Sequence, residues 1–302
     1  MFEKCAGCGN ILIPRFFNVL DSITNQTFDI YRCPECGLGH TVPQPKNLNE
    51  HYENIYYGNR HGFTARYCTR RRLGFVASAM KEQSGKRLLD IGCGDGSFLL
   101  AARSAGWIVV GTEMNPEPGR VAGLDVREDI TQVSDCALFD CITMWHTLEH
   151  MRDIGSTLSN VSRLLKPDGK VLIAVPDNGS LQSRLFRQTW LHLDVPRHLY
   201  HFDAGSLSFC LKRAGFTVER QWHQELEYDL MGWSQSALNC LFPAPNVFFD
   251  QLTGRQRNHS ALLKIISFAL GSILTGLTLP AVAVEKLFGR SGTIIAVASR
   301  VK

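Results

Sequence analysis

Two cysteine pairs near the N-terminus have the residue types and the spacing of a metal site. Cys5-Ala-Gly-Cys8-Gly and Cys33-Pro-Glu-Cys36-Gly share one Cys-x-x-Cys-Gly pattern. Each short turn directs two thiolates toward one point, and four thiolates in a tetrahedron suit Zn2+. The alternative is a redox Cys-x-x-Cys motif, which is expected once and beside a βαβ unit. We therefore predict a closed, structural zinc ribbon over residues 1–45, with a short β-ribbon within residues 11–32.

A glycine-rich turn later in the chain has the composition of a nucleoside cradle. The apolar run 87–91 includes Asp90 and leads into Gly92-Cys93-Gly94-Asp95-Gly96-Ser97. The spacing G-x-G-x-G lacks the third glycine of the dinucleotide pattern, which disfavours a nicotinamide dehydrogenase. S-adenosylmethionine has no pyrophosphate, and a turn without Cβ atoms admits its amino-acid tail and ribose. This turn therefore favours S-adenosylmethionine as the cofactor.

Acidic residues at strand ends complete the predicted cofactor site. Glu113 closes the next predicted strand, where a carboxylate can accept two hydrogen bonds from a ribose diol. Asp129 ends the third predicted strand and is a candidate for the adenine amine, although the adjacent Glu128 leaves the register open. The predicted cofactor-binding set is Asp90, Gly92, Cys93, Gly94, Gly96, Glu113, Met114, Asp129, Trp145 and His146.

Four histidines follow the fourth and fifth predicted strands. Methyl transfer from a sulfonium is an in-line displacement, and a hydroxyl or acidic carbon acceptor also benefits from a general base. Histidine suits that role near neutral pH, although each of these residues could instead be structural. The candidates are His150 and His198, then His146 and His201, with Arg197 as a candidate acceptor clamp. We see no carboxylate cluster that predicts Mg2+.

Alternating strands and helices must position these residues. An alternation of this kind predicts an α/β fold with a parallel, Rossmann-like sheet, covered on both faces, whose ligands bind beyond the carboxyl ends of the strands. A lead-in helix is expected at 64–82. Strands are expected at 87–91, 108–113, 125–129, 139–145, 170–175, 216–222 and 293–299, helices at 98–105, 116–122, 154–165 and 206–214, and a turn at 166–169.

Three of these segments resemble the motifs of class I S-adenosylmethionine-dependent methyltransferases, namely 88–96, 139–150 and 164–176. Glu149-His150, the segment 194–202 and the zinc ribbon resemble a bacterial subfamily similar to ubiquinone-biosynthesis methyltransferases, often linked to polysaccharide or small-molecule tailoring. The resemblance covers nearly the whole chain. It implies a seven-stranded sheet whose last strand, at 293–299, is antiparallel, and it leaves the acceptor open.

We divide the chain accordingly into five segments. The division is a zinc ribbon (1–45), a linker with the lead-in helix (46–85), a cofactor-binding core (86–225), a helical cap inserted before the last strand (226–290) and that strand (291–302).

The apolar stretch 265–284 contains no charged residue and has the length of a transmembrane segment. Gly271, Gly276 and Pro280 interrupt it, and a single crossing would separate the last strand from its sheet. We expect a helical hairpin over 261–288 that packs on the domain or forms a homodimer contact, with peripheral membrane contact as the alternative. An apolar lid there would suit a lipid-linked or aromatic acceptor.

Composition restricts the class of protein further. The 302 residues are 44% hydrophobic and carry a formal charge of +4, which fits one large domain with appendages and does not demand nucleic acid. The first ten residues form no apolar signal segment, and the remaining cysteines lie mostly in apolar stretches, as is typical of a reducing cytoplasm. We expect a cytoplasmic location, at the inner membrane surface if the hairpin contacts lipid.

These features predict S-adenosylmethionine-dependent O- or C-methylation of a small-molecule, glycan or lipid-linked acceptor. The alternative is an RNA methyltransferase that binds phosphates through the ribbon and the arginines at 66 and 70–72. That run is more typical of a solvated helix face. An inactive module with the same fold is disfavoured by Asp90, the glycine turn and Glu113.

Overall fold

The computed structural model describes residues 3–52, 64–80, 86–134, 138–255 and 257–301. Its contacts divide the chain into two units. The first, which we name the sheet unit, consists of residues 64–175, 207–222 and 295–302. The second, which we name the ribbon unit, consists of residues 1–63, 176–206 and 223–294.

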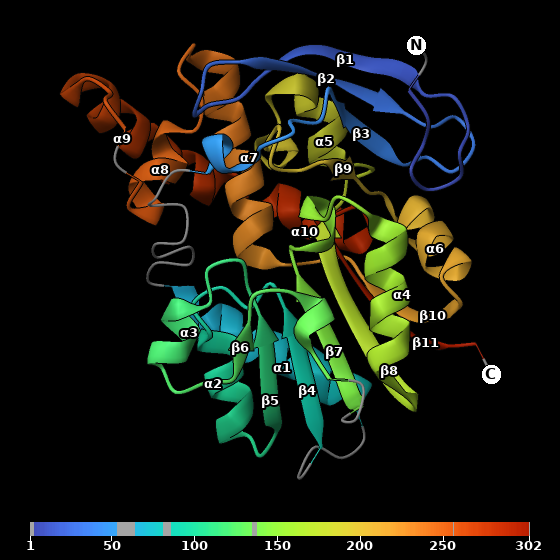
Figure 1. Cartoon of the computed structure of the whole chain (residues 1–302). Helices are drawn as coiled ribbons and strands as arrows, with labels where there is room; N and C mark the ends of the chain where they lie inside the picture. Colours follow the sequence, from blue (N-terminus) through green and yellow to red (C-terminus); the bar gives the residue numbers. More distant parts are fainter. Residues whose placement is uncertain (1–2, 53–63, 81–85, 135–137, 256, 302) are drawn as a thin grey trace. The chain divides into compact units, whose positions relative to one another are not determined.

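The sheet unit is built on seven strands in the order β10-β11-β8-β7-β4-β5-β6. The strands from β8 to β6 in this order are parallel to their neighbours, whereas β10 and β11 pair antiparallel, as the resemblance implied. Helices cover both faces of the sheet (Figure 1), so the central strands are mostly apolar and largely buried. The strands are β4 (Arg87–Ile91), β5 (Ile108–Thr112), β6 (Val126–Arg127), β7 (Phe139–Trp145), β8 (Leu165–Pro176), β10 (Phe216–Trp222) and β11 (Thr293–Arg300).

The helices of this unit follow the predicted alternation closely. The lead-in helix begins near the predicted residue and ends at Ala79, while the predicted 81–82 lie outside the described residues. The helices are α1 (Ala65–Ala79), α2 (Ser97–Ser104), α3 (Glu117–Val121), α4 (Ile154–Leu164) and most of α6 (Ala204–Arg213), with short 3-10 turns η3 (Ile130–Gln132) and η4 (Leu148–His150).

One predicted turn is wrong. The segment 166–169 belongs to β8, which begins directly after α4. The β7–β8 register passes from Phe139↔Leu165 to Cys141↔Lys170, so the strand accommodates the extra residues as an irregularity in the ladder. Lys166 also pairs with Asp140 of β7 at 2.8 Å. The third strand is also shorter than expected, because only Val126–Arg127 pair with β5.

The ribbon unit contains a second, antiparallel sheet in the order β1-β2-β3-β9. Strands β1 and β2 form the predicted β-ribbon, whereas β9 comes from the chain after the fifth strand of the other sheet. The elements are β1 (Ile13–Leu20), β2 (Thr27–Arg32), β3 (Gly39–Val42), η1 (Asn49–His51), α5 (Leu181–Phe186), η5 (Arg187–Thr189), η6 (Leu191–Leu193), β9 (Tyr200–His201), α7 (Leu226–Leu241), α8 (Val247–Thr253), α9 (Ala261–Leu277) and α10 (Leu279–Leu287).

The cysteine ribbon is not a separate module. Phe16, Phe28 and Ile30 from its strands form one buried cluster with Trp190 and Val195 from the segment 176–206. The ribbon, that segment and the helices of 223–294 therefore form one unit, instead of the separate domains 1–45 and 226–290 that we predicted. The predicted linker 46–85 is described only at 46–52 and 64–80.

The predicted hairpin of 261–288 is a bent helix pair. α9 and α10 follow each other with a bend of 43°, whereas a hairpin requires a near reversal of direction. Thr278 separates the two helices, and Pro280 occupies the first turn of α10, where its missing N–H costs nothing. Within the described part of the chain, no single helix has the length and apolarity to cross a membrane, although this bent pair meets both criteria when taken together.

Candidate functional site

The four N-terminal thiols converge as predicted. Cys5 Sγ lies 3.5 Å from Cys36 Sγ, Cys8 Sγ lies 3.3 Å from Cys33 Sγ, and all four sulfurs lie within 4.8 Å of one another. Zn–S bonds of about 2.3 Å in a tetrahedron require S–S separations of about 3.8 Å. The cluster therefore fits Zn2+ in size and in chemistry.

The two cysteine turns have the same local geometry. Gly9 N–H donates to the Cys5 carbonyl at 2.8 Å, and Gly37 N–H donates to the Cys33 carbonyl at 3.1 Å. Both glycines adopt the left-handed backbone region, with φ of +83° and +80°, where a side chain is strained. The glycine after each second cysteine thus closes the turn that directs its two thiolates inward.

The glycine turn after β4 contains three glycines with a left-handed backbone, Gly92, Gly94 and Gly96. At two of them, neighbouring side chains leave no room for a Cβ atom. A Cβ at Gly92 would lie 2.4 Å from Thr147 Oγ1, and one at Gly96 would lie 2.5 Å from Leu124 Cδ1. Gly94 has φ of +56°, and apart from its two chain neighbours no described residue has a heavy atom within 4 Å of its Cβ position. Gly94 therefore marks the open side of the turn.

Glu113 lies against this open residue. Its Oε2 accepts a hydrogen bond from Gly94 N–H at 2.8 Å, and its Oε1 accepts one from Met114 N–H at 2.9 Å. A carboxylate has about four acceptor positions, so this geometry retains capacity for the hydroxyls of a ligand. The predicted acid and the predicted turn are therefore adjacent in the sheet unit.

Asp90 lies in β4, two residues before Gly92 of the turn. It is 2% exposed, and its Oδ1 accepts a hydrogen bond from Thr143 Oγ1 of β7 at 2.6 Å. Burial raises the pKa of Asp90 to about 7, an effect that the Thr143 hydrogen bond opposes. Thr143 is absent from the predicted site, although a hydroxyl within an apolar strand is the kind of signal that could have identified it.

The other predicted cofactor residues differ in their surroundings. Cys93 and Trp145 direct their side chains into the buried core of the unit. The Trp145 ring contacts the edge of Phe98, with centroids 5.7 Å apart. Asp129 Oδ1 accepts hydrogen bonds from the N–H and the hydroxyl of Thr131 at 2.8 and 2.7 Å. Met114 is 62% exposed beside Glu113.

His146 and His150 lie at the carboxyl end of β7. His146 has a left-handed backbone with φ of +53°, and its N–H donates to Ala174 at 2.9 Å. This conformation is uncommon outside glycine and collects at functional sites. His150 is half-buried and ends η4, one turn after Thr147, which packs on Gly92. Both histidines thus belong to the same strand-end region as the glycine turn.

His201 lies in the ribbon unit and is buried. Thr41 Oγ1 donates to the His198 carbonyl at 2.6 Å and lies 3.0 Å from His201 Nε2. Because the hydroxyl has one hydrogen, His201 Nε2 must donate to Thr41. Burial keeps the pKa of His201 well below its usual value. The ring is therefore neutral and links β9 to β3 through Thr41, which disfavours a role as base.

His198 also belongs to the ribbon unit, with a different hydrogen-bond pattern. Its Nδ1 lies 2.9 Å from the His192 carbonyl, which can only accept a hydrogen bond. Nδ1 therefore carries a proton, and Nε2 lies 3.9 Å from Asp194 Oδ2. The neutral form of this ring is compatible with proton acceptance at Nε2.

Arg197 is not an acceptor clamp in this structure. Its side chain is 1% exposed, and Nη1 donates to Asp21 Oδ1 at 3.0 Å and to the His51 carbonyl at 2.8 Å. Nη2 and Nε donate to Asp194 Oδ1 at 2.6 and 3.1 Å. The guanidinium fork is directed at protein groups, so the predicted role is replaced by a structural one. Asp21 and His51 were missed because Asp21 precedes Arg197 by 176 residues.

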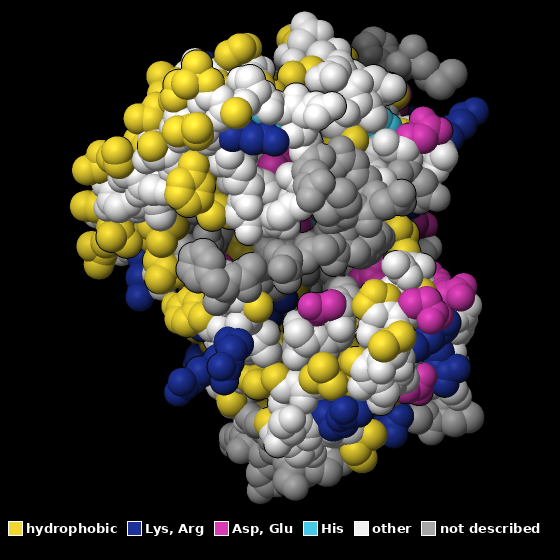
Figure 2. All heavy atoms as spheres, turned by 90° about the vertical axis from the view of Figure 1, so that its left-hand side faces the viewer, with side chains coloured by type: hydrophobic (Ala, Val, Ile, Leu, Met, Phe, Trp, Pro, Cys, Tyr) yellow, Lys and Arg dark blue, Asp and Glu magenta, His cyan; other side chains and the backbone are white. Residues whose placement is uncertain are grey.

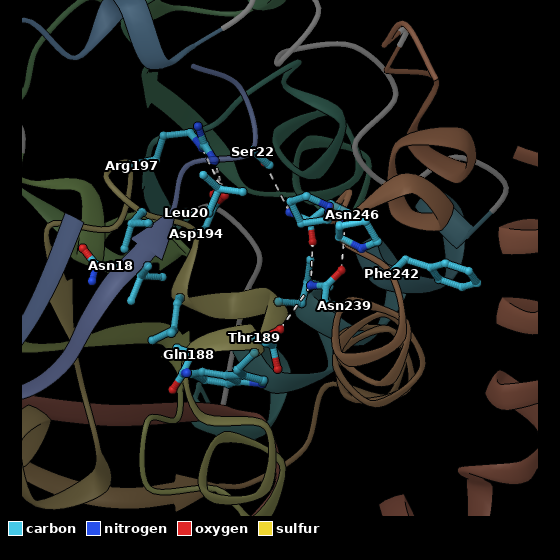
Figure 3. Close-up of a pocket in the computed structure, with 17 residues that line it drawn as sticks. Asn18, Leu20, Ser22, Gln188, Thr189, Asp194, Arg197, Asn239, Phe242 and Asn246 are labelled. Atoms are coloured by element: carbon cyan, nitrogen blue, oxygen red, sulfur yellow. Dashed lines mark hydrogen bonds and ion pairs between the residues drawn. The ribbon is translucent and has the colours of Figure 1, made fainter. Parts of the chain in front are cut away.

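A cavity of about 210 Å³ lies within the ribbon unit beside this ion-pair network (Figure 3). Figure 3 shows the side chains of Asn239 and Asn246 directed toward each other. Asn239 Nδ2 donates to Asn246 Oδ1 at 3.0 Å and to the Thr189 carbonyl at 3.1 Å, and Asn246 Nδ2 donates to Ser22 Oγ at 3.3 Å. Three of the polar side chains in the lining, Ser22, Asn239 and Asn246, thus already bond one another.

Comparison with known proteins identifies the family. Residues 60–221, more than half of the chain, match the family described as methyltransferase domain. The chain belongs to the methyltransferase domain family. The methyltransferase-domain match includes the glycine turn, Glu113 and the histidines at the end of β7. The cysteine cluster and the helices α7 to α10 lie outside it.

Curated relatives are similar over a shorter stretch. The ubiquinone biosynthesis O-methyltransferase of Haemophilus ducreyi is 33% identical over 119 residues, covering 34% of this chain and 50% of that protein. The same enzyme of Vibrio vulnificus is 31% identical over 127 residues, covering 38% and 54%. The chain thus spans about half the length of the curated relatives it matches. A solved S-adenosylmethionine-dependent methyltransferase of Archaeoglobus fulgidus aligns with a TM-score of 0.48 at 17% identity, over 78% of this chain and 94% of that one.

Proposed function

We propose that the chain transfers the methyl group of S-adenosylmethionine to a hydroxyl oxygen of a small-molecule acceptor. The observation that carries the proposal is the contact between Gly94, the open residue of the glycine turn, and Glu113 at the end of β5. Membership of the methyltransferase domain family supports the reaction class. The names of the relatives, ubiquinone biosynthesis O-methyltransferases, support an oxygen as the acceptor atom.

The residues around the turn have separate roles in binding the cofactor. Bound S-adenosylmethionine supplies an electrophilic methyl carbon on its sulfonium. Glu113 accepts hydrogen bonds from the ribose hydroxyls, and Gly94 lets the backbone approach the ligand closely. Asp129 is the candidate partner of the adenine amine. Asp90 acts through Thr143 and the turn, because its own carboxyl is buried.

His150 is our first candidate for the general base. It follows β7 at the carboxyl end of the sheet, where open α/β sheets bind their ligands, and it is half-buried. An imidazole nitrogen of His150 would take the hydroxyl proton as the oxygen attacks the methyl carbon. His198 is the second candidate because its neutral form has a lone pair on Nε2. The strained His146 is a third candidate, as a residue that positions the end of β7.

Small aromatic alcohols are the first acceptor class to test, followed by glycans and lipid-linked molecules. RNA is less favoured, since two arginines of the run pack on aromatic side chains of their own unit. The Arg72 guanidinium lies 5.3 Å from the centre of the Trp145 ring, and that of Arg71 lies 5.5 Å from the centre of the Phe75 ring. These cations stack on aromatic side chains instead of forming a free phosphate-binding face. The cysteine cluster would hold Zn2+ as a structural ion.

The test combines calorimetry with a labelled methyl donor. The wild type should bind S-adenosylmethionine and label a hydroxyl compound from a panel of phenols, glycans, lipid extracts and RNA. His150→Ala should lower turnover at least tenfold with unchanged cofactor affinity, while the control His259→Ala, outside the family match, should leave both unchanged. A chain that binds no S-adenosylmethionine would overturn the proposal. Loss of cofactor affinity in His150→Ala would remove that residue from the acceptor side.

A further inference from the structure

The bent helix pair α9–α10 presents an apolar surface to solvent. On α9, Leu262, Ile265, Ile273 and Leu277 are 58–70% exposed, and Leu287 and Phe288 at the end of α10 are 83% and 73% exposed. Figure 2 shows hydrophobic side chains gathered over the region of α9. We name these six residues the apolar helix surface. Water-exposed apolar surface of this extent marks an interaction site.

The polarity of α9 is inverted relative to a helix of a water-soluble protein. Its buried residues are Ser267 and Gly271, which lie one turn apart and face the rest of the unit. A Cβ at Gly271 would lie 2.4 Å from Cγ of the Phe248 ring, so the small residue is required for close packing. Small and polar residues thus face inward and apolar residues face outward, the reverse of the usual amphipathic pattern.

The angular width of the exposed apolar face of α9 distinguishes between a lipid bilayer and a second protein helix as its binding partner. Phe268 and Leu270 are 50% and 37% exposed, and two successive steps of 100° place them about 200° apart on the helix. Ile265, Leu262 and Ile273 occupy the arc between them. A seam with a second helix uses a stripe of roughly 100° or less. An arc twice as wide favours a fluid apolar medium over a second copy of this chain.

The charges around the surface are complementary to anionic headgroups. Residues 241–292 contain only two acids, Asp250 and Glu285, and both are at most 2% exposed. The same stretch contains five lysines and arginines, of which Lys286 and Arg290 are exposed and Lys264 is half-buried. Basic residues beside an apolar helix face add electrostatic attraction to acidic lipids.

We propose that α9 and α10 form a monotopic docking surface for an anionic lipid bilayer, which they enter without crossing. The 43° bend and the break at Thr278 suit a pair of helices that follows the interface and does not span the hydrocarbon. The proposal is independent of methyl transfer. It would bring the enzyme to acceptors that are dissolved in, or anchored to, a membrane.

Vesicle flotation with the full chain tests this surface. Wild type should float with phosphatidylcholine vesicles that contain phosphatidylglycerol. The triple variant Ile265→Gln, Ile273→Gln, Leu277→Gln should bind these vesicles at least tenfold more weakly. The matched control Ile108→Gln, Val121→Gln changes apolar side chains that are 50% and 85% exposed in the sheet unit, and it should float like wild type. Lys264→Gln with Lys286→Gln should weaken binding to anionic vesicles more than to pure phosphatidylcholine vesicles.

Circular dichroism of every variant shows whether it is folded. Failure of the folded wild type to float with either vesicle would overturn the proposal. A dimer detected by light scattering that the triple variant dissociates, without vesicle binding, would assign the surface to a second copy. Resistance to carbonate extraction, together with protease cleavage of the chain on one side of the helix pair and protection of the chain on the other, would show a crossing. Cofactor titration in the same samples separates this outcome from a failure of the proposed function.

Discussion

The backbone N–H of Gly94 lies 2.8 Å from Oε2 of Glu113, so the glycine turn and the acid after β5 meet directly. The contact follows from the sheet, because β4 and β5 are parallel neighbours and Ile91 pairs with Thr112 at their carboxyl ends. The loops that follow β4 and β5 therefore begin side by side at the carboxyl edge of the sheet. In this arrangement the acid at position 113 bonds the turn directly, and we propose that it also binds the ribose of the cofactor.

Replacement of Glu113 should weaken cofactor binding. Glu113→Gln removes the negative charge and half of the acceptor capacity, so we expect the Kd for S-adenosylmethionine to rise about tenfold or more. Isothermal titration measures it. Glu117→Gln is the matched control, since Glu117 is an exposed acid in α3 that pairs with Arg120. Equal affinity in Glu113→Gln and wild type would show that this carboxylate does not hold the ribose.

Gly94→Ala and Gly123→Ala form a matched pair. Both glycines are left-handed, with φ of +56° and +72°, and the described residues leave the Cβ position of each open to 4 Å. Each alanine should therefore lower the free energy of unfolding by about 1 kcal/mol through backbone strain. Only Gly94→Ala should also lose cofactor affinity, because its methyl group would occupy the ligand space. If both variants bind S-adenosylmethionine equally well, the open side of the turn is not the cradle.

Part of this site could be predicted from sequence because it follows from local patterns. The runs 139–145 and 216–222 are strands with the predicted bounds. The first is a largely apolar, buried run, and the second follows the glycine that ends a helix, so both have clear local boundaries. The alternation of helices and strands then brings residues 94 and 113 to one edge of the sheet. The turn predicted at 166–169 failed because Pro-Asp-Gly is only a local signal, and β8 contains these residues as an irregularity between the pairs Phe139↔Leu165 and Cys141↔Lys170.

The stability of the protein should depend on the titration of Asp90. Burial raises its folded pKa to about 7 from 3.8, so the unfolded chain loses this proton first as the pH rises. The free energy of unfolding should fall between about pH 4 and pH 7 and then level off, with a contribution on the order of 4 kcal/mol. Asp90→Asn should flatten this part of the profile, since its amide oxygen still accepts from Thr143.

Denaturant unfolding at a series of pH values measures the Asp90 effect. Asp125→Asn, which changes an acid with a half-exposed side chain in the same unit, should keep the wild-type slope. If the free energy of unfolding of Asp90→Asn still falls between about pH 4 and pH 7, the pH dependence belongs to other groups.

Removal of zinc should destabilise the ribbon unit. We expect one Zn2+ per chain by metal analysis, and Cys33→Ser should abolish it and lower the unfolding temperature by about 10 °C. The exposed Cys240 provides the control variant Cys240→Ser, which should retain the metal. Chelation of wild type should reproduce the Cys33→Ser result, and added Zn2+ should reverse it. Full metal content in Cys33→Ser would exclude the four-cysteine site.

Arg197→Met should lower the free energy of unfolding of the protein. The substitution leaves the buried Asp21 and the half-buried Asp194 without their guanidinium, and the loss of one member of a buried ion pair costs about 4 kcal/mol. Urea unfolding measures the cost, and the exposed Arg184→Met in the same unit is the control. A stable Arg197→Met enzyme with a raised KM for its acceptor would restore the clamp that the sequence suggested.

The ion-pair network of Arg197 could not be predicted from sequence. Asp21 lies in the cysteine ribbon, where the surrounding residues suggest a surface acid that offsets basic neighbours, yet it is fully buried. Its partners His51 and Arg197 lie 30 and 176 residues further along the chain. Charged residues in loops have no periodicity that reveals burial, so only the fold identifies the pairing.

The addition of β9 to the cysteine ribbon has a consequence for biosynthesis. Thr41 of β3 and His201 of β9 touch across a separation of 160 residues. On the ribosome, the thiols are therefore available to capture metal early, while the neighbouring edge of β3 stays without its partner until all of the parallel strands, β4 to β8, have been translated. The nascent chain thus carries an open β-edge for much of its synthesis, and that edge is where we would expect a chaperone to act.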